Sequence, residues 1–173
     1  PSLLATRDKG GDIVNIAQVF TRSGMTELTW KTSGITTIKK MAGKKVGVWC
    51  CVNENELYAA LDNNGINPKD PKSVTIVNQP FDMTLFLQNK VDAAAAMTYN
   101  ELAQVLETKN PDTGKLYTLA DLNVITMEKA GTAMKFLENC TPGYYNNEGK
   151  VSERNVQNGF YGGGTGSPEF FAI

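Results

Sequence analysis

The chain of 173 residues contains no histidine. Within this chain, that absence excludes Ser-His and Cys-His nucleophile pairs and every metal site with an imidazole ligand. The three cysteines are Cys50, Cys51 and Cys140, and an odd count makes a poor disulfide framework. Cys50 and Cys51 are adjacent, and adjacent cysteines rarely bridge each other without strain. They are either small residues that fill a turn or thiols activated at a helix N-terminus, and both interpretations stay open.

Charge of one sign is also lacking, because 17 basic residues balance 18 acidic ones and no basic cluster stands out. Nucleic-acid binding therefore has no electrostatic support, and we expect no nucleic-acid partner. No apolar run is long enough to predict a membrane-spanning helix. No signal peptide is visible, but Pro1 is not a natural translation start, so we expect that a preceding segment was removed. The missing signal therefore decides nothing about localisation.

The stretch from Gly43 to Gly65, GKKVGVWCCVNENELYAALDNNG, is typical of a strand, a loop and a helix. Its apolar run at 46–49 indicates a strand buried on both faces. Asn53 and Glu56 have the spacing of a capping box and predict the helix start, while Gly65 predicts its end. The pattern fits a purely structural α/β unit. It equally places a helix N-terminus at the C-terminal end of a strand, where ligands of open α/β sheets bind.

The same alternation continues along the chain and predicts a three-layer α/β fold with a mostly parallel sheet and right-handed crossovers. Asn89 is expected to take a left-handed conformation at a helix end, and 110–114 to form a turn. Strands are predicted at 12–20, 27–31, 46–49, 73–77, 91–97 and 122–127, and helices at 2–9, 36–41 (or a 3₁₀ turn), 53–65, 83–87 and 99–106.

The end of the chain differs from the rest. From Thr141 onward the apolar periodicity stops and glycine becomes dense. The pentapeptide at 166–170, GSPEF, is either a translated cloning site or native sequence, and both readings stay open. No fold is assigned to this tail.

Polar and aromatic residues follow three of the predicted strands, where the next helix begins. Because the strands are parallel, these residues should face one edge of the sheet. Tyr99 is placed to stack on a flat heteroaromatic ring, while carboxylates and amides hydrogen-bond to its ring nitrogens and an exocyclic amine. Asn53 has a second interpretation as a cap, and Phe81 and Trp49 as core residues. The predicted ligand-binding residues are Asn53, Glu54, Phe81, Tyr99, Asn100, Glu101 and Trp30; no catalytic or metal-binding residue and no cofactor is predicted.

Several blocks in order resemble one known family. They include DIVNIAQVF, LTWK, GKKVGVW, VTIV with QPFDM, VDAA, DLNVI and GTAM, and run from about Leu3 to Met134. The chain resembles substrate-binding proteins of the thiamine-pyrimidine type, which are type II periplasmic binding proteins. That family contains ABC-transporter receptors for pyrimidine precursors of thiamine and the fungal synthase that makes the pyrimidine.

The resemblance implies two α/β lobes that clamp a ligand and close by a hinge motion of two crossing segments. Mapped on this chain, residues 1–34 are a remnant of the first lobe with the first crossing, and 35–122 are the second lobe. Residues 123–140 are the second crossing, and 141–173 are the irregular tail. Most of the first lobe is expected to precede Pro1, so the chain looks like a partial member of the family.

Three functions remain open from the sequence. The first is a non-enzymatic receptor for a thiamine pyrimidine precursor or a similar heteroaromatic, periplasmic or extracytoplasmic, with an ABC-transporter membrane subunit as its implied partner. The second is a fragment of the iron-dependent synthase, which in fungal members consumes its own histidine; this chain lacks histidine and that group's cysteine cluster. The third is an inactive fragment that forms a homodimer through its exposed lobe interface.

Overall fold

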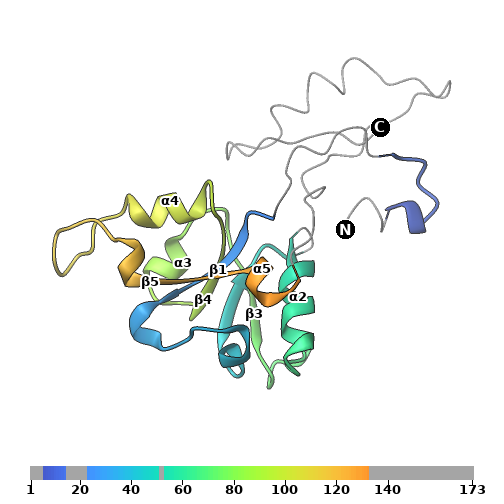
Figure 1. The fold of residues 1–173 in the computed structure, drawn as a ribbon, viewed down its shortest axis with the longest axis horizontal. Coiled ribbons are helices and arrows are strands. Elements are labelled where there is room, and N and C mark those ends of the chain that lie inside the picture. Colours follow the sequence, from blue (N-terminus) through green and yellow to red (C-terminus); the bar gives the residue numbers. More distant parts are fainter. Residues whose placement is uncertain (1–5, 15–22, 51–52, 133–173) are drawn as a thin grey trace, which may run out of the picture. The chain divides into compact units, whose positions relative to one another are not determined.

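The computed structural model describes residues 6–14, 23–50 and 53–132 (Figure 1). The chain divides into two compact units, one made of 1–22 with 134–173 and the other of Ser23–Ala133. In the first unit, residues 6–8 are helical and 12–14 form no strand. The rest of the strand predicted over 12–20, and the tail from Thr141, lie outside the described residues. The domain boundaries at 34, 122 and 140 stay predictions.

The second unit is built on one five-stranded sheet with the order β3-β2-β4-β1-β5. β2 pairs in parallel with β3 and β4, whereas β1 is antiparallel to both β4 and β5. Four strands therefore point the same way and β1 opposes them, which confirms a mostly parallel sheet. The strands are β1 (Met25–Trp30), β2 (Lys45–Val48), β3 (Thr75–Asn78), β4 (Ala93–Met97) and β5 (Leu122–Thr126).

Helices cover both faces of this sheet (Figure 1). α2 leads from β2 outward to β3, whereas α3 and α4 lead in the opposite direction across the sheet, so right-handed crossovers put α2 on one face and α3 and α4 on the other. α5 packs against α2. The helices are α2 (Glu54–Asn63), α3 (Thr84–Leu87), α4 (Glu101–Leu106) and α5 (Met127–Ala130), with 3₁₀ turns η1 (Lys31–Ser33), η2 (Ile38–Met41) and η3 (Leu119–Asp121).

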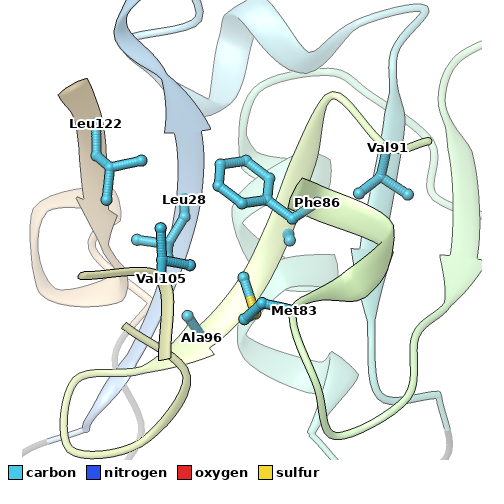
Figure 2. Close-up of a cluster of buried hydrophobic side chains, with 8 residues drawn as sticks. Leu28, Met83, Phe86, Val91, Ala96, Val105 and Leu122 are labelled. Carbon is cyan, nitrogen blue, oxygen red and sulfur yellow. The ribbon is translucent and has the colours of Figure 1, made fainter. Parts of the chain in front are cut away.

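A cluster of buried apolar side chains joins α3 and α4 to the sheet. Figure 2 shows Leu28 of β1, Phe86 of α3 and Val105 of α4 converging in this cluster, and all three are fully buried. Trp30 packs at its margin, with its ring stacked on Phe86 at 4.5 Å between centroids. This core holds the two helices in place, so that the loops before them have fixed positions at the edge of the sheet.

β4 consists of four alanines and Met97, all buried. Alanine favours helix by intrinsic propensity, but a short run between turns was predicted to be a strand, and the structure confirms it. Small side chains on both faces let the covering helices approach the sheet closely. Tertiary packing therefore decides the conformation of this segment.

The two ends of α2 meet the predictions differently. Gly65 has φ of +73° and its N–H donates to the carbonyl of Asp62, so the predicted C-terminal end is confirmed. The predicted capping box is wrong, because the Asn53 side chain makes no capping hydrogen bond. The Glu56 carboxylate instead accepts a hydrogen bond of 2.7 Å from the Ser23 hydroxyl, so a distant partner replaces the local one. Asn89 has φ of +54°, as predicted.

Within the described ranges, every helix is too short or too polar to cross a lipid bilayer.

Candidate functional site

The C-terminal ends of β2, β3, β4 and β5 meet the start of β1 at one edge of the sheet, which we call the carboxyl edge. The strand registers establish this, because Val48 pairs with Asn78 and Met25 pairs with Met97. Three loops at this edge lead into α2, α3 and α4. They bring together six of the seven residues predicted to bind ligand, namely Asn53, Glu54, Phe81, Tyr99, Asn100 and Glu101.

Trp30 is the exception, because β1 runs against its neighbours. It pairs with Leu122, the first residue of β5, and so lies at the opposite edge of the sheet. There it packs on Phe86 and on Tyr117, whose ring centroid is 4.8 Å away, and lines a separate surface cavity of about 480 Å³. The structure therefore does not bring Trp30 together with the other six residues.

The start of α2 presents two side-chain oxygens without a hydrogen-bond donor. Asn53 is only 4% exposed, and its Oδ1 has no partner. Glu54 Oε2 is likewise buried and unpartnered. Buried polar atoms are normally hydrogen-bonded, so these two oxygens are candidate acceptors for the N–H group of a bound molecule. Both residues stand at the N-terminus of a ten-residue helix, whose dipole stabilises the Glu54 carboxylate.

The loop after β3 presents an aromatic ring to solvent. Phe81 is 54% exposed, so its interpretation as a core residue is wrong. One face of its ring stacks on Trp49, with centroids 5.8 Å apart and an interplanar angle of 17°. Trp49 is buried, as expected of a core residue, and its Nε1 donates to the carbonyl of Pro80 at 3.2 Å. The exposed Phe81 ring therefore packs on a buried indole that is itself hydrogen-bonded to the loop.

Gln79 joins this loop to β4, and nothing in the sequence singled it out. Its side-chain amide pairs with both backbone groups of Ala95, accepting from the N–H at 3.1 Å and donating to the carbonyl at 2.8 Å. The side chain passes so close to Gly47 that a Cβ there would lie 2.5 Å from Gln79 Oε1. A glycine in a buried strand is the sequence signal for such a close approach, although it does not identify the approaching residue.

The loop between β4 and α4 is closed by Glu101, which is 2% exposed. Its carboxylate accepts from the backbone N–H of Met97 and from Asn100 Nδ2, each at 2.9 Å. Burial raises the pKa of Glu101, and these hydrogen bonds oppose that rise. Both of its oxygens therefore already have protein donors. Asn100 Oδ1 in turn accepts from Gln104 Nε2 at 3.2 Å, so this pair shapes the loop.

Tyr99 lies on the same loop and is 40% exposed. Its ring approaches the backbone of Gly24, where a Cβ would lie 3.0 Å from Tyr99 Cε1. The carbonyl of Gly24 also accepts from the N–H of Thr98 at 2.9 Å. The segment that enters β1 therefore lies beside Tyr99 at the carboxyl edge.

The loop before α2 contains the Cys50 thiol, which is half-buried. The Cys50 N–H donates to Asn78 Oδ1 at 3.1 Å and so joins the loop after β2 to the last residue of β3. Cys51 lies outside the described residues. No three His, Cys, Asp or Glu side chains in 6–14, 23–50 and 53–132 come together in a group that could hold a metal ion.

Taken together, the carboxyl edge combines an exposed ring packed on a buried indole, a second partly exposed aromatic ring and buried acceptor atoms. Stacking surfaces of this kind suit planar ligands, and unpaired acceptors suit ligand N–H groups.

The family model described as "NMT1/THI5 like" matches residues 1–151 of the chain. No curated protein is similar enough to count as a match. Among solved structures, an ancestral arginine-binding protein bound to arginine is 20% identical with a TM-score of 0.43, over 76% of this chain and 49% of that one. An ABC uptake transporter substrate-binding protein from Streptococcus pneumoniae with bound histidine is 23% identical with a TM-score of 0.43, over 71% of this chain and 46% of that one. The chain thus spans about half the length of these structures.

Proposed function

Because the chain belongs to the NMT1/THI5-like family, we propose that it is a non-enzymatic solute-binding protein of the ABC-transporter receptor type. Its ligand is a pyrimidine precursor of thiamine or a similar small heteroaromatic amine. The protein acts in the periplasm or another extracytoplasmic space, and its partner is the membrane subunit of the transporter.

The observation that supports this proposal most strongly is the pairing of two features at the carboxyl edge. The exposed ring of Phe81 offers a face for stacking, and Asn53 Oδ1 and Glu54 Oε2 are buried acceptors without a donor. An aminopyrimidine has complementary groups, because its ring is flat and its exocyclic amine donates hydrogen bonds. A ligand rich in acceptors, such as a carboxylate, would leave the two oxygens unsatisfied.

The proposal is tested by thermal unfolding and calorimetric titration of the full chain with aminopyrimidines, thiamine and riboflavin. A ligand that binds only the folded state stabilises it by about 2.7 kcal/mol at a hundredfold excess over Kd. We expect one of the aromatic amines to raise the Tm, and Phe81→Ala to abolish that rise. An unchanged Tm with every compound, confirmed by the absence of heat in the titration, would contradict the proposal.

A further inference from the structure

Trp49 and Phe81 form a two-ring stack that is buried at one end and open at the other. Trp49 is 3% exposed and Phe81 is 54% exposed, although the rings are nearly parallel and 5.8 Å apart. This separation lies in the range of offset-stacked aromatic pairs. An exposed phenylalanine side chain normally samples several rotamers. Because Phe81 stacks on the buried indole of Trp49, its rotamer is restrained and its free face has a defined orientation.

Hydrogen bonds restrain the chain on either side of Phe81 in the sequence. The indole N–H of Trp49 donates to the carbonyl of Pro80, the residue before Phe81. On the other side of Phe81, Asp82 Oδ1 accepts from the N–H of Thr84 at 2.8 Å. Trp49 therefore contacts the neighbouring loop twice, through its ring and through its N–H, and the loop has few ways to move without breaking one of these contacts.

We propose that Trp49 is a positioning residue of the carboxyl edge, whose three loops form the ligand wall: its indole packs against one face of the Phe81 ring, so that the free face of Phe81 receives the planar ring of the ligand. This inference rests on the proposed function and says how the site would select the flat ring of such a ligand. The bound state is then a three-ring stack of Trp49, Phe81 and ligand. Preorganisation of Phe81 reduces the conformational entropy that ligand binding would otherwise lose.

The decisive experiment measures Kd by calorimetry with 4-amino-2-methylpyrimidine as the planar probe and cyclohexylamine as the non-planar control, on the full chain. Trp49→Phe keeps a ring beneath Phe81, whereas Trp49→Leu removes it. Met41→Ala serves as the control, since Met41 is fully buried in η2, which precedes β2 at the edge of the sheet opposite the carboxyl edge. The Tm of each variant is recorded alongside.

We expect the wild type to bind the aminopyrimidine and not cyclohexylamine. Trp49→Leu should weaken aminopyrimidine binding about tenfold, which corresponds to the upper range of aromatic pair energies. Trp49→Phe should stay within about threefold of the wild type, a margin for the lost N–H contact to Pro80. Met41→Ala should lower the Tm without changing Kd.

A spectroscopic readout separates positioning from simple core packing. The chain has two tryptophans, so Trp30→Phe leaves Trp49 as the only indole fluorophore. Adding the aminopyrimidine should change the emission of Trp49, because a third ring joins its stack, and Phe81→Ala should remove that change. A purely structural Trp49 would show no such dependence on Phe81.

The outcomes distinguish the two proposals. A wild type that binds no aromatic amine overturns the proposed function and this inference with it. A wild type that binds while Trp49→Leu binds equally well overturns the positioning role alone. Equal loss of affinity in Trp49→Leu and Met41→Ala also overturns it, because the effect would then follow from stability.

Discussion

Glu27 is fully buried in the middle of β1, and neither of its carboxylate oxygens has a hydrogen-bond partner. The residues opposite it on the neighbouring strands are Ala95 and Ile125, which offer neither charge nor side-chain hydrogen bonds. Burial therefore raises the pKa of Glu27 well above its ordinary value. A carboxyl group in this position opposes folding at neutral pH, because the unfolded chain ionises it more easily.

This burial predicts a specific pH dependence. Since the folded pKa is raised, the unfolded state binds fewer protons than the native state above about pH 4.3, the usual pKa of glutamate. Stability should therefore fall as the pH rises from that value toward the folded pKa. Glu27→Met should reduce this slope and stabilise the protein at pH 7, as measured by urea unfolding from pH 4 to 8.

The matched control is Glu107→Met, which removes an exposed carboxyl at the end of α4. It should leave the pH dependence as it is in the wild type. If Glu27→Met and the wild type showed parallel stability profiles across this range, the burial argument would be wrong.

For the site residues, the sequence predicts the position in the fold but not the hydrogen-bond partners. The chemical character of Asn53, Glu54 and Phe81 follows from their place just after predicted strands. Their hydrogen-bond partners do not follow from local sequence. At the same helix start, for example, the donor to Glu56 is Ser23, 33 positions away. Glu101 was expected to face a ligand, yet its oxygens take the N–H of Met97 and the amide of Asn100. Such partners depend on backbone geometry that local sequence patterns do not encode.

At the scale of elements, the parallel strands β2 and β4 are joined partly by a side chain. Their paired register covers only Val46 with Ala93 and Gly47 with Ala94. Beyond it, Gln79 fills the place of a strand partner by bonding both backbone groups of Ala95. The Gln79 amide is therefore one of the contacts that set the position of the loop that carries Phe81.

A double-mutant cycle tests this arrangement. Gly47→Ala should destabilise the protein by about 1–3 kcal/mol, because the new Cβ would lie 2.5 Å from Gln79 Oε1. Gln79→Ala should cost a similar amount, since two buried backbone groups lose their partners. Denaturant unfolding of the double variant should show no further loss beyond Gln79→Ala. Fully additive losses would show that Gly47 and Gln79 do not act on each other.

The elements that sequence patterns predicted best are those with a continuous apolar run, such as β2, β4 and β5. The pattern missed α5, because four residues are too few to show helical periodicity. It also left open the direction of β1, which is set by pairing with β4 and β5 far along the chain. The direction of β1 decides at which edge of the sheet Trp30 lies. The sequence pattern did not give this direction, and for that reason Trp30 was wrongly grouped with the other predicted ligand-binding residues.

At the scale of the whole molecule, β1 lies between β4 and β5 inside the sheet. The family resemblance places β1 in the first crossing segment, which stays a prediction. Met25 and Leu28 of this strand are buried on opposite faces of the sheet. Any unit that folds around this sheet must therefore contain β1 and β5 as well as the predicted lobe at 35–122.

Two fragments test this requirement. A fragment of residues 23–133 should unfold cooperatively, because it contains the complete sheet and both covering layers. A fragment of residues 35–122 lacks β1 and nearly all of β5, so β4 would lose a partner and the core around Phe86 would open. Thermal unfolding followed by circular dichroism should show a transition only for the longer fragment. Cooperative folding of the shorter one would refute the structural role given to β1.

The central claim is that the carboxyl edge is the ligand wall. The most direct test is to titrate the ¹⁵N-labelled chain with an aminopyrimidine and to follow the amide chemical shifts. The shifts should change at 53–54, 78–82 and 98–101, and stay constant at Gly43, Gly65 and Asn89, which precede the strands at the opposite edge. Changes clustered around Gly43, Gly65 and Asn89, with the three loops unaffected, would contradict the account.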